Sequence, residues 1–415
     1  MDLQLNRIRQ LLDLLGSPEK RLKCVHVTGT NGKGTTDCYL SSFLVEATKG
    51  KINIAQFSSP HLLHPRDCIR LNTRPIGPEE YNELVEIVDR ADSSIGAGCT
   101  SFEKLTAAAF LYFAQKEASI CVIEVGLGGR LDATNVISTP ELCLFTSIGL
   151  DHVDMLGGTI EAIAKEKSGI IKRGTTVISA ALQDKAALSV IQQTCDTLDV
   201  PLSVSEISSD VQESSLSVPQ KINLSLAISA FEAIQSNHPD LFESLGRQDL
   251  INTAHNITWP GRMEWLYIEP VGLVLVDGAH NEAGLQALRS FVSSLQKPTT
   301  WILGFKGGKD LQNLFNHLLI KGDQVIITEY EGVEGMPWIK SATIEEMQDA
   351  LNKIPDKPNN VTSYKHISEL FHTQTYRKVS RQEVTDRLAQ CSQIHVVCGS
   401  LYLITSLFKH IKYEI

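Results

Sequence analysis

Several features that would place this 415-residue chain in a familiar class are missing from its sequence. No apolar run approaches the roughly 20 residues that a helix needs to span a bilayer, so we expect no membrane association. The N-terminus lacks the basic start, apolar stretch and cleavage site of a secretory signal. The nine cysteines include no C-x-x-C pair, which argues against a zinc or thiol enzyme and favours a reducing compartment, the cytoplasm.

Positive charge is also scarce. The chain has 38 Lys and Arg against 48 Asp and Glu, which gives a formal net charge of −10. Binding along a nucleic acid requires clustered Lys and Arg to neutralise phosphates, so we expect no nucleic-acid partner. With 42% apolar and 21% charged residues the composition is that of a folded, water-soluble protein. Its length exceeds what one hydrophobic core usually serves, so we start from two domains.

What the sequence does contain is an alternation of short β-rich runs and helical stretches from residue 22 onward. Continuous apolar runs such as 119–125 and 141–148 are typical of parallel strands covered on both faces. Strands alternating with helices predict a doubly wound α/β sheet. The Ser-rich stretch 203–220 is predicted to be a surface excursion, and 364–387 has no interpretable pattern.

A second complete series of strands and helices begins after the sequence WPGR at 259–262. We therefore place a domain boundary near residue 264, which gives a first α/β domain at 1–264 and a second at 265–415.

A glycine-rich segment, TGTNGKGT at 28–35, follows a predicted strand and opens a predicted helix. In that context backbone N–H groups can surround phosphate oxygens, a lysine can neutralise them and a threonine hydroxyl can reach Mg²⁺. The alternative is an ordinary Gly-rich turn. The spacing is two residues shorter than that of the common P-loop motif. The predicted nucleotide-binding residues are Thr30, Asn31, Gly32, Lys33, Gly34 and Thr35.

GTNGKGT resembles the nucleotide loop of the Mur ligase superfamily, and specifically its folylpolyglutamate and dihydrofolate synthases. Further segments resemble that branch in the same order, and two near the C-terminus resemble its fungal dihydrofolate synthases. The resemblance implies an N-terminal P-loop-type ATPase domain and a C-terminal Rossmann-like domain. The ordered segments are SSPHL (58–62), EVGLGGRLDATN (124–135), LDHVDMLG (150–157), KEKSGI (165–170), WPGR (259–262) and DGAHN (277–281), and the fungal-type ones are VEGMPW (333–338) and VVCGSLYL (396–403).

The resemblance also implies two Mg²⁺ sites. Glu124, at the end of a predicted strand, matches the family's metal-binding glutamate, and the alternative is an ion pair with Arg130. Lys167 matches a lysine that CO₂ converts to a carbamate ligand, whereas Lys165 and Lys172 are expected to be solvated. For each of the other predicted ligands, the alternative to metal binding is an ordinary surface residue or a residue that caps a turn. The full predicted set is Thr35, Ser59, Glu124, His152 and Lys167.

In the second domain the resemblance implies that Arg262 contacts phosphate and Asp277 contacts ribose. A planar guanidinium suits phosphate, although a surface Arg after a turn and a strand-end Asp are the alternatives. His280 and Asn281 are expected near the reacting groups.

The activity implied is ligation of L-glutamate to dihydropteroate through an acyl-phosphate, with ATP as the phosphate donor and Lys33, Lys167 and His280 as catalytic residues. The alternative within the family is a folylpolyglutamate synthase, or a bifunctional enzyme, acting on a reduced folate. Outside the family, a regulatory P-loop ATPase is possible, although the N-K-x-D motif of GTPases is absent. We expect the enzyme to act as a monomer.

Overall fold

The computed structural model describes residues 5–214, 216–332, 336, 338–355, 358, 360–371 and 375–415. The chain forms two compact units. The first comprises Met1–His61 and Pro65–Ile257, and the second comprises Leu62–His64 and Thr258–Ile415. The division at 257/258 precedes strand β9 (Glu264–Ile268), on whose first residue the predicted border falls.

The first unit is built on an eight-stranded sheet, counted over the described residues, in the order β4-β3-β2-β5-β1-β6-β7-β8. The strands from β2 to β8 in this order run parallel, and β3 and β4 form an antiparallel edge. The strands are β1 (Cys24–Thr28), β2 (Ile54–Phe57), β3 (Ile69–Leu71), β4 (Arg74–Pro75), β5 (Ile120–Glu124), β6 (Leu142–Phe145), β7 (Thr176–Ser179) and β8 (Leu202–Val204).

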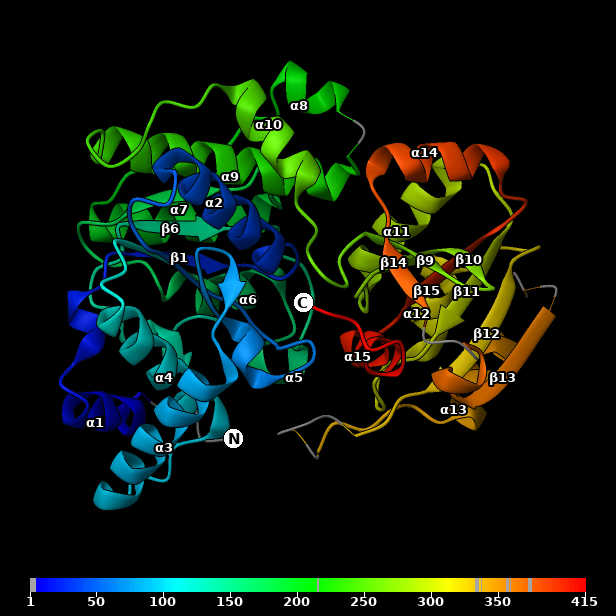
Figure 1. Ribbon diagram of the computed structural model, residues 1–415, viewed down its shortest axis with the longest axis horizontal. Coiled ribbons are helices and arrows are strands. Elements are labelled where there is room, and N and C mark those ends of the chain that lie inside the picture. The colour runs from blue at the N-terminus through cyan, green and yellow to red at the C-terminus, as the bar shows by residue number, and fades with distance from the viewer. Residues whose placement is uncertain are drawn as a thin grey trace. The chain divides into compact units, whose positions relative to one another are not determined.

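Helices cover both faces of this sheet, because its central strands are apolar on both sides. Figure 1 shows α2, α9 and α10 on one face and α1, α3 and α4 on the other. Helices α6 and α7 pack over β6 and β7 on the face opposite α2 and α9. The helices are α1 (Asn6–Leu14), α2 (Lys33–Thr48), α3 (Pro78–Ile95), α4 (Ser101–Gln115), α5 (Val153–Leu156), α6 (Ile160–Ser168), α7 (Lys185–Leu198), α8 (Ser209–Glu213), α9 (Val218–Asn237) and α10 (Arg247–Asn256).

The second unit contains a seven-stranded sheet, again counted over the described residues, in the order β13-β12-β11-β15-β10-β9-β14. Strands β10 to β13 and β15 run parallel, whereas β9 and β14 form an antiparallel edge that the sequence pattern does not predict. Besides β9, the strands are β10 (Gly272–Val276), β11 (Thr299–Leu303), β12 (Gln324–Glu329), β13 (Asn360–His366), β14 (Tyr376–Lys378) and β15 (Ile394–Cys398).

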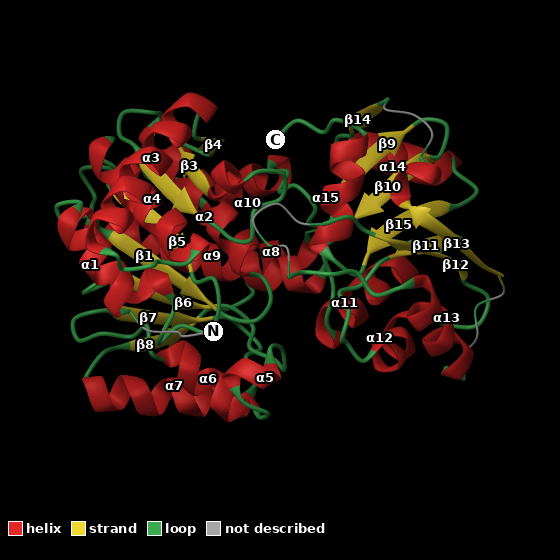
Figure 2. Cartoon of the chain, turned by 90° about the horizontal axis from the view of Figure 1, so that it is seen from below, coloured by secondary structure: helices red, strands yellow, loops and turns green. Residues whose placement is uncertain are grey.

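Helices again pack on both faces. Figure 2 shows α11, α12 and α13 side by side along one face, and α15 packs on the other. This confirms the predicted fold of two doubly wound α/β units. The helices are α11 (Glu282–Ser294), α12 (Leu311–Leu318), α13 (Ile344–Lys353), α14 (Arg381–Gln390) and α15 (Leu401–His410). Within the described part of the chain, no helix is both long and apolar enough to cross a membrane.

The Ser-rich stretch 203–220 is not only a surface excursion, which corrects the prediction. Val211 of α8 and Leu216 are buried and join the apolar core beneath α2 and α9. The pattern fails here because the two buried apolar residues are separated by polar ones, of which Gln212 and Glu213 are exposed.

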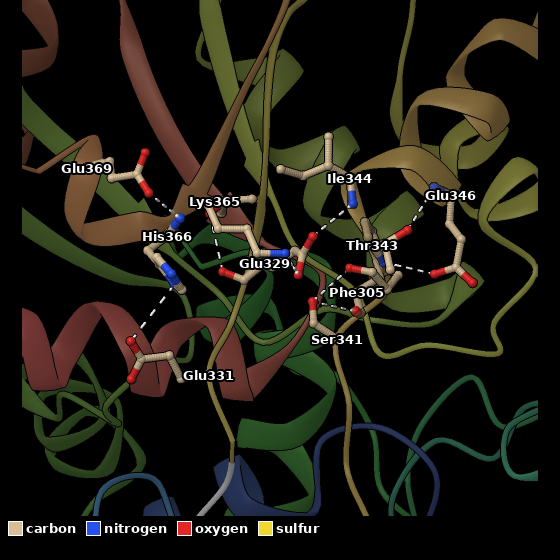
Figure 3. Close-up of polar contacts among 12 residues, drawn as sticks. Phe305, Glu329, Glu331, Ser341, Thr343, Ile344, Glu346, Lys365, His366 and Glu369 are labelled. Carbon is tan, nitrogen blue, oxygen red and sulfur yellow. Dashed lines mark hydrogen bonds and ion pairs between the residues drawn. The ribbon is translucent and has the colours of Figure 1, made fainter.

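The unassigned stretch 364–387 contains the end of β13, β14 and most of α14. Figure 3 shows how polar contacts secure β13 at the sheet edge: Lys365 donates to Glu329 at 2.6 Å, and the backbone N–H of Ile344 donates to the other Glu329 oxygen at 3.1 Å. Glu329 therefore links the end of β12 both to β13 and to the start of α13, where Thr343 and Glu346 cap each other.

Candidate active site

The predicted site residues of the first unit follow neighbouring strands. β2, β5, β1 and β6 lie side by side and parallel, so their carboxyl ends meet at one edge of the sheet. Ser59 follows β2, Glu124 ends β5, and the phosphate loop follows β1. Ligands of open α/β sheets bind at this edge.

The phosphate loop is held by the segment after β6. The backbone N–H groups of Thr30 and Asn31 both donate to the carbonyl of Ser147, at 2.9 and 3.2 Å, and the Thr30 hydroxyl donates to the carbonyl of Gly149 at 3.0 Å. Gly32 has φ +93°, and a Cβ there would come within 2.2 Å of the Asn223 side chain. The loop thus needs glycine both for its backbone conformation and for space.

Lys33 and Glu124 face each other at this edge. The ammonium of Lys33 lies 3.9 Å from Glu124 Oε1 and donates to the carbonyls of Gly29 and Thr30, at 3.2 and 3.3 Å. The backbone N–H of Ser59 donates to Glu124 Oε2 at 3.1 Å. A lysine and a carboxylate therefore stand together at the start of α2, where phosphate and its metal ion would bind.

Lys167 reaches the same loop from α6. Its ammonium donates to the Gly29 carbonyl at 2.7 Å, so two lysines share that carbonyl. The side chain is buried, and burial together with the charge of Lys33 lowers the pKa of Lys167 to about 7, against the opposing effect of Asp151 and Asp132. A large fraction of this lysine is consequently an uncharged amine at neutral pH, the form that reacts with CO₂.

The alternative role of Glu124, an ion pair with Arg130, is wrong. Arg130 pairs with Glu166 through contacts of 3.0 to 3.2 Å. Lys165 is exposed as expected, but Lys172 is half-buried and donates to the carbonyl of Gly169 at 3.1 Å. Burial lowers the pKa of Lys172, which corrects its interpretation as a solvated lysine.

The remaining predicted metal ligands lie on separate elements. Thr35 is in the first turn of α2, and Ser59 precedes a cis proline, Pro60. His152 precedes α5 with φ +51°, and its side chain is exposed. The strand before it, β6, ends at Phe145, three residues short of the predicted run 141–148.

The donor set at the sheet edge fits Mg²⁺, which takes hard oxygen ligands and needs only one or two protein carboxylates beside phosphate and water. Glu124 is such a carboxylate, and the hydroxyls of Ser59 and Thr35 are further oxygen donors. Over the described residues no group of three or more His, Cys, Asp and Glu side chains could hold a metal ion. Oxygen donors beside a phosphate loop suit a metal ion that phosphate also binds.

Asp132 is a residue of this region that the sequence did not single out. Its carboxylate accepts from the backbone N–H groups of Leu127 and Thr134, at 2.9 and 3.0 Å, and from the Thr134 hydroxyl at 2.6 Å. That hydroxyl also contacts Nε2 of the buried His26 on β1, at 2.8 Å. These bonds order the loop that follows Glu124. The sequence does not predict them, because an Asp two residues before a Thr is a common pattern.

Asp37 is a second residue of this region that the sequence pattern does not predict. It is fully buried on α2, where Ser41 donates to its Oδ1 at 3.3 Å. Burial, followed by the nearby Glu124 carboxylate, raises its pKa well above the usual value. The sequence does contain a signal for Asp37, which is the single acidic residue in the otherwise apolar turn DCYL. Burying a carboxyl group is costly, so a carboxyl group in an apolar turn indicates a specific role.

In the second unit the WPGR turn and the DGAHN segment meet. Asp277 follows β10, and its two oxygens accept from the N–H groups of Met263 and Ala279, both at 2.8 Å. A Cβ on Gly278 would come within 2.7 Å of an Arg262 nitrogen, so Arg262 lies directly beside this segment. Burial raises the pKa of Asp277, and Arg262 opposes that shift.

The two other predicted residues of this segment lie at the start of α11. Asn281 caps the helix by accepting from the N–H of Gly284 at 3.0 Å. His280 Nδ1 contacts the carbonyl of Gly278 at 2.8 Å, and Lys309 donates to the His280 carbonyl at 2.7 Å. The structure therefore groups Arg262, Asp277 and His280 within one unit.

Of the two fungal-type segments, VVCGSLYL forms the end of β15 and the start of α15, with Gly399 at φ +106° and Ser400 capping the helix. In VEGMPW, residues 333–335 and 337 lie outside the described residues. Met336 packs against the core beneath α15.

The fold and the phosphate loop define a ligase of the Mur type, and comparison with known proteins agrees. The Mur ligase middle domain matches residues 27–200, and the C-terminal domain of dihydrofolate synthetase matches residues 269–410. A probable dihydrofolate synthetase of Schizosaccharomyces pombe is 32% identical over 100% of both chains. The dihydrofolate synthetase of Saccharomyces cerevisiae is 33% identical, over 99% of this chain and 98% of its own.

Among solved structures, folylpolyglutamate synthase of Mycobacterium tuberculosis, complexed with ADP and AMPPCP, has a TM-score of 0.80 at 26% identity and covers 99% of this chain and 96% of its own. The chain belongs to the dihydrofolate synthase and folylpolyglutamate synthase family of Mur ligases. The resemblance seen in the sequence is confirmed.

Proposed function

We propose that this enzyme is a dihydrofolate synthase, which joins L-glutamate to 7,8-dihydropteroate and converts ATP to ADP and phosphate. The observation that carries the proposal is the convergence of Lys33, Glu124 and Lys167 on the phosphate loop. The family supports the choice of acceptor, because the two relatives described above, 32% and 33% identical over nearly the whole chain, are named dihydrofolate synthetases.

A carboxylate is a poor electrophile, so the acceptor must first be activated. The γ-phosphoryl group of ATP passes to the acceptor carboxylate, which gives an acyl-phosphate and ADP. The uncharged amine of glutamate then attacks the acyl carbon and phosphate leaves. Lys33, fixed by two backbone carbonyls, would stabilise the charge of the transferring group, because a positioned cation costs no reorganisation during the reaction.

We propose two Mg²⁺ sites for this reaction. Thr35, Ser59 and Glu124 would hold one, and His152 with a carbamylated Lys167 would hold the other. When bound, such ions polarise phosphoryl oxygens and neutralise negative charge. The low pKa of Lys167 favours carbamate formation, since only the uncharged amine reacts with CO₂.

In the second unit we propose that Arg262 contacts phosphate, Asp277 contacts ribose, and His280 lies near the reacting groups. The enzyme is proposed to act as a cytoplasmic monomer, without a nucleic-acid or membrane partner.

The decisive experiment compares acceptors. Purified enzyme is incubated with ATP, Mg²⁺ and L-glutamate, with either dihydropteroate or tetrahydrofolate, and products are separated by mass. We expect glutamate to be incorporated with dihydropteroate, and little glutamate to be incorporated with tetrahydrofolate. Incorporation with tetrahydrofolate alone would identify a folylpolyglutamate synthase, and comparable incorporation with both acceptors would identify a bifunctional enzyme. ATP hydrolysis that does not depend on an acceptor would identify a regulatory ATPase.

A further inference from the structure

The WPGR turn is anchored on both sides of Arg262 by carboxylates. On the N-terminal side, the N–H of Gly261 donates to Glu264 Oε2 at 2.8 Å. On the C-terminal side, the N–H of Met263 donates to Asp277 Oδ2 at 2.8 Å. The direction in which the Arg262 side chain leaves the backbone is therefore set by two acidic residues.

Glu264 is an acidic residue in a buried position, because it is only 3% exposed. A buried carboxylate is costly unless hydrogen-bond donors satisfy it. One oxygen accepts from Gly261, and the other accepts from the hydroxyl of Tyr413. Burial raises the pKa of Glu264, while Tyr413, Gly261 and the charge of Lys378 oppose the shift. Tyr413 thus supplies half of the bonds that stabilise the carboxylate beside the turn.

Tyr413 belongs to the last residues of the chain, and its ring is held firmly. It stacks on Phe408 with ring centres 4.0 Å apart, and on Tyr376 at 5.4 Å. The ammonium of Lys378 lies 4.5 Å from the ring centre. A ring packed in this way, 4% exposed, has little freedom to turn, so its hydroxyl is a fixed donor toward Glu264.

The turn also packs closely on α15, the helix that leads into this tail. Gly261 has φ +70°, and a Cβ there would come within 3.2 Å of Ile404. Its carbonyl accepts from the N–H of Gly278 at 2.9 Å. The turn, the tail and the DGAHN segment therefore form one rigid arrangement within the second unit.

We propose that Tyr413 and Glu264 are positioning residues: they fix the backbone before Arg262 and so set the affinity of the enzyme for ATP. This inference rests on the proposed function, in which Arg262 contacts phosphate. Neither Tyr413 nor Glu264 needs to touch the nucleotide. Their effect appears in ATP affinity and in the KM for ATP more than in kcat.

Tyr413→Phe tests the proposal, because it removes the hydroxyl and keeps the stacked ring. Tyr376→Phe is the matched control: its hydroxyl accepts from the backbone N–H of Glu414 at 2.8 Å, so it secures the same tail without contacting Glu264. Binding of AMPPNP to the full-length protein is measured by calorimetry, and unfolding temperature is recorded alongside. We expect Tyr413→Phe to weaken binding about five- to tenfold and Tyr376→Phe less than about twofold.

A double-mutant cycle checks that Tyr413 acts through Glu264. In a Glu264→Ala background, Tyr413→Phe should change AMPPNP affinity no further. Equal effects of Tyr413→Phe and Tyr376→Phe, or an undiminished effect of Tyr413→Phe without Glu264, would overturn the positioning role.

Arg262→Ala tests the phosphate contact of Arg262 separately from the positioning role of Tyr413. If wild-type enzyme binds AMPPNP and Arg262→Ala does not weaken binding, the proposed phosphate contact fails. If Arg262→Ala weakens binding while Tyr413→Phe leaves it unchanged, only the positioning role fails.

Discussion

The phosphate loop of the first unit and the WPGR turn of the second are both glycine-containing turns, but different contacts hold them. The phosphate loop is held by the carbonyls of Ser147 and Gly149, which follow the neighbouring strand. The WPGR turn is held by the carboxylates of Glu264 and Asp277. The backbone contacts of the phosphate loop follow from the order of strands in a parallel sheet. The carboxylate contacts of the WPGR turn depend on single side chains.

The largest expected effect concerns Lys167 at the phosphate loop. We expect Lys167→Ala to lower kcat about 100-fold or more, because the variant loses a buried amine that contacts the Gly29 carbonyl in the phosphate loop. Lys165→Ala is the matched control, since Lys165 lies on the same helix and is exposed. Bicarbonate or short carboxylates should partly restore the rate, as measured by ADP release. A fully active variant whose rate does not respond to them would refute the ligand role.

Gly32 offers a second way to break the phosphate loop. Gly32→Ala introduces a side chain at φ +93° and pushes it against Asn223. We expect AMPPNP affinity to fall more than about tenfold, because the loop must change shape. Gly50 also has positive φ, at +72°, but lies in open space, so Gly50→Ala isolates the backbone effect. Comparable losses of affinity in the two variants would show that the loop itself is not the cause.

These two regions also show how far the sequence alone could reach. Lys33, Glu124 and Lys167 were predicted because each sits in a segment with a recognisable pattern, and parallel strands bring such segments to one edge. The pairing of Glu264 with Tyr413 joins residues 149 positions apart, in an antiparallel strand and in the tail. No periodicity or spacing encodes that contact, because it arises only when α15 packs on the sheet.

The pH dependence of stability is a third test. The folded pKa of Lys167, about 7, lies below its ordinary 10.5, so the unfolded chain binds more protons between these values and stability rises with pH across that window. The contribution is up to about 1.4 kcal/mol for each pH unit. In CO₂-free buffer, urea unfolding of Lys167→Met between pH 7 and 10 should show a correspondingly smaller rise than wild type. An unchanged slope, as expected for the Lys165→Met control, would mean that Lys167 titrates normally.

The smallest effect is expected at the edge of the second sheet, where Lys365 and Glu329 pair. Lys365 is 60% exposed and Glu329 16%, so water and salt screen the pair and Lys365→Ala should cost less than about 1 kcal/mol of unfolding free energy. Glu329→Ala should cost more, because it also removes the acceptor for the N–H of Ile344 at the start of α13. Urea unfolding in low and high salt measures both. A larger loss for Lys365→Ala than for Glu329→Ala would mean that the exposed charge, and not the backbone contact, secures β13. An exposed charge would then secure β13, much as the carboxylates of Glu264 and Asp277 secure the WPGR turn.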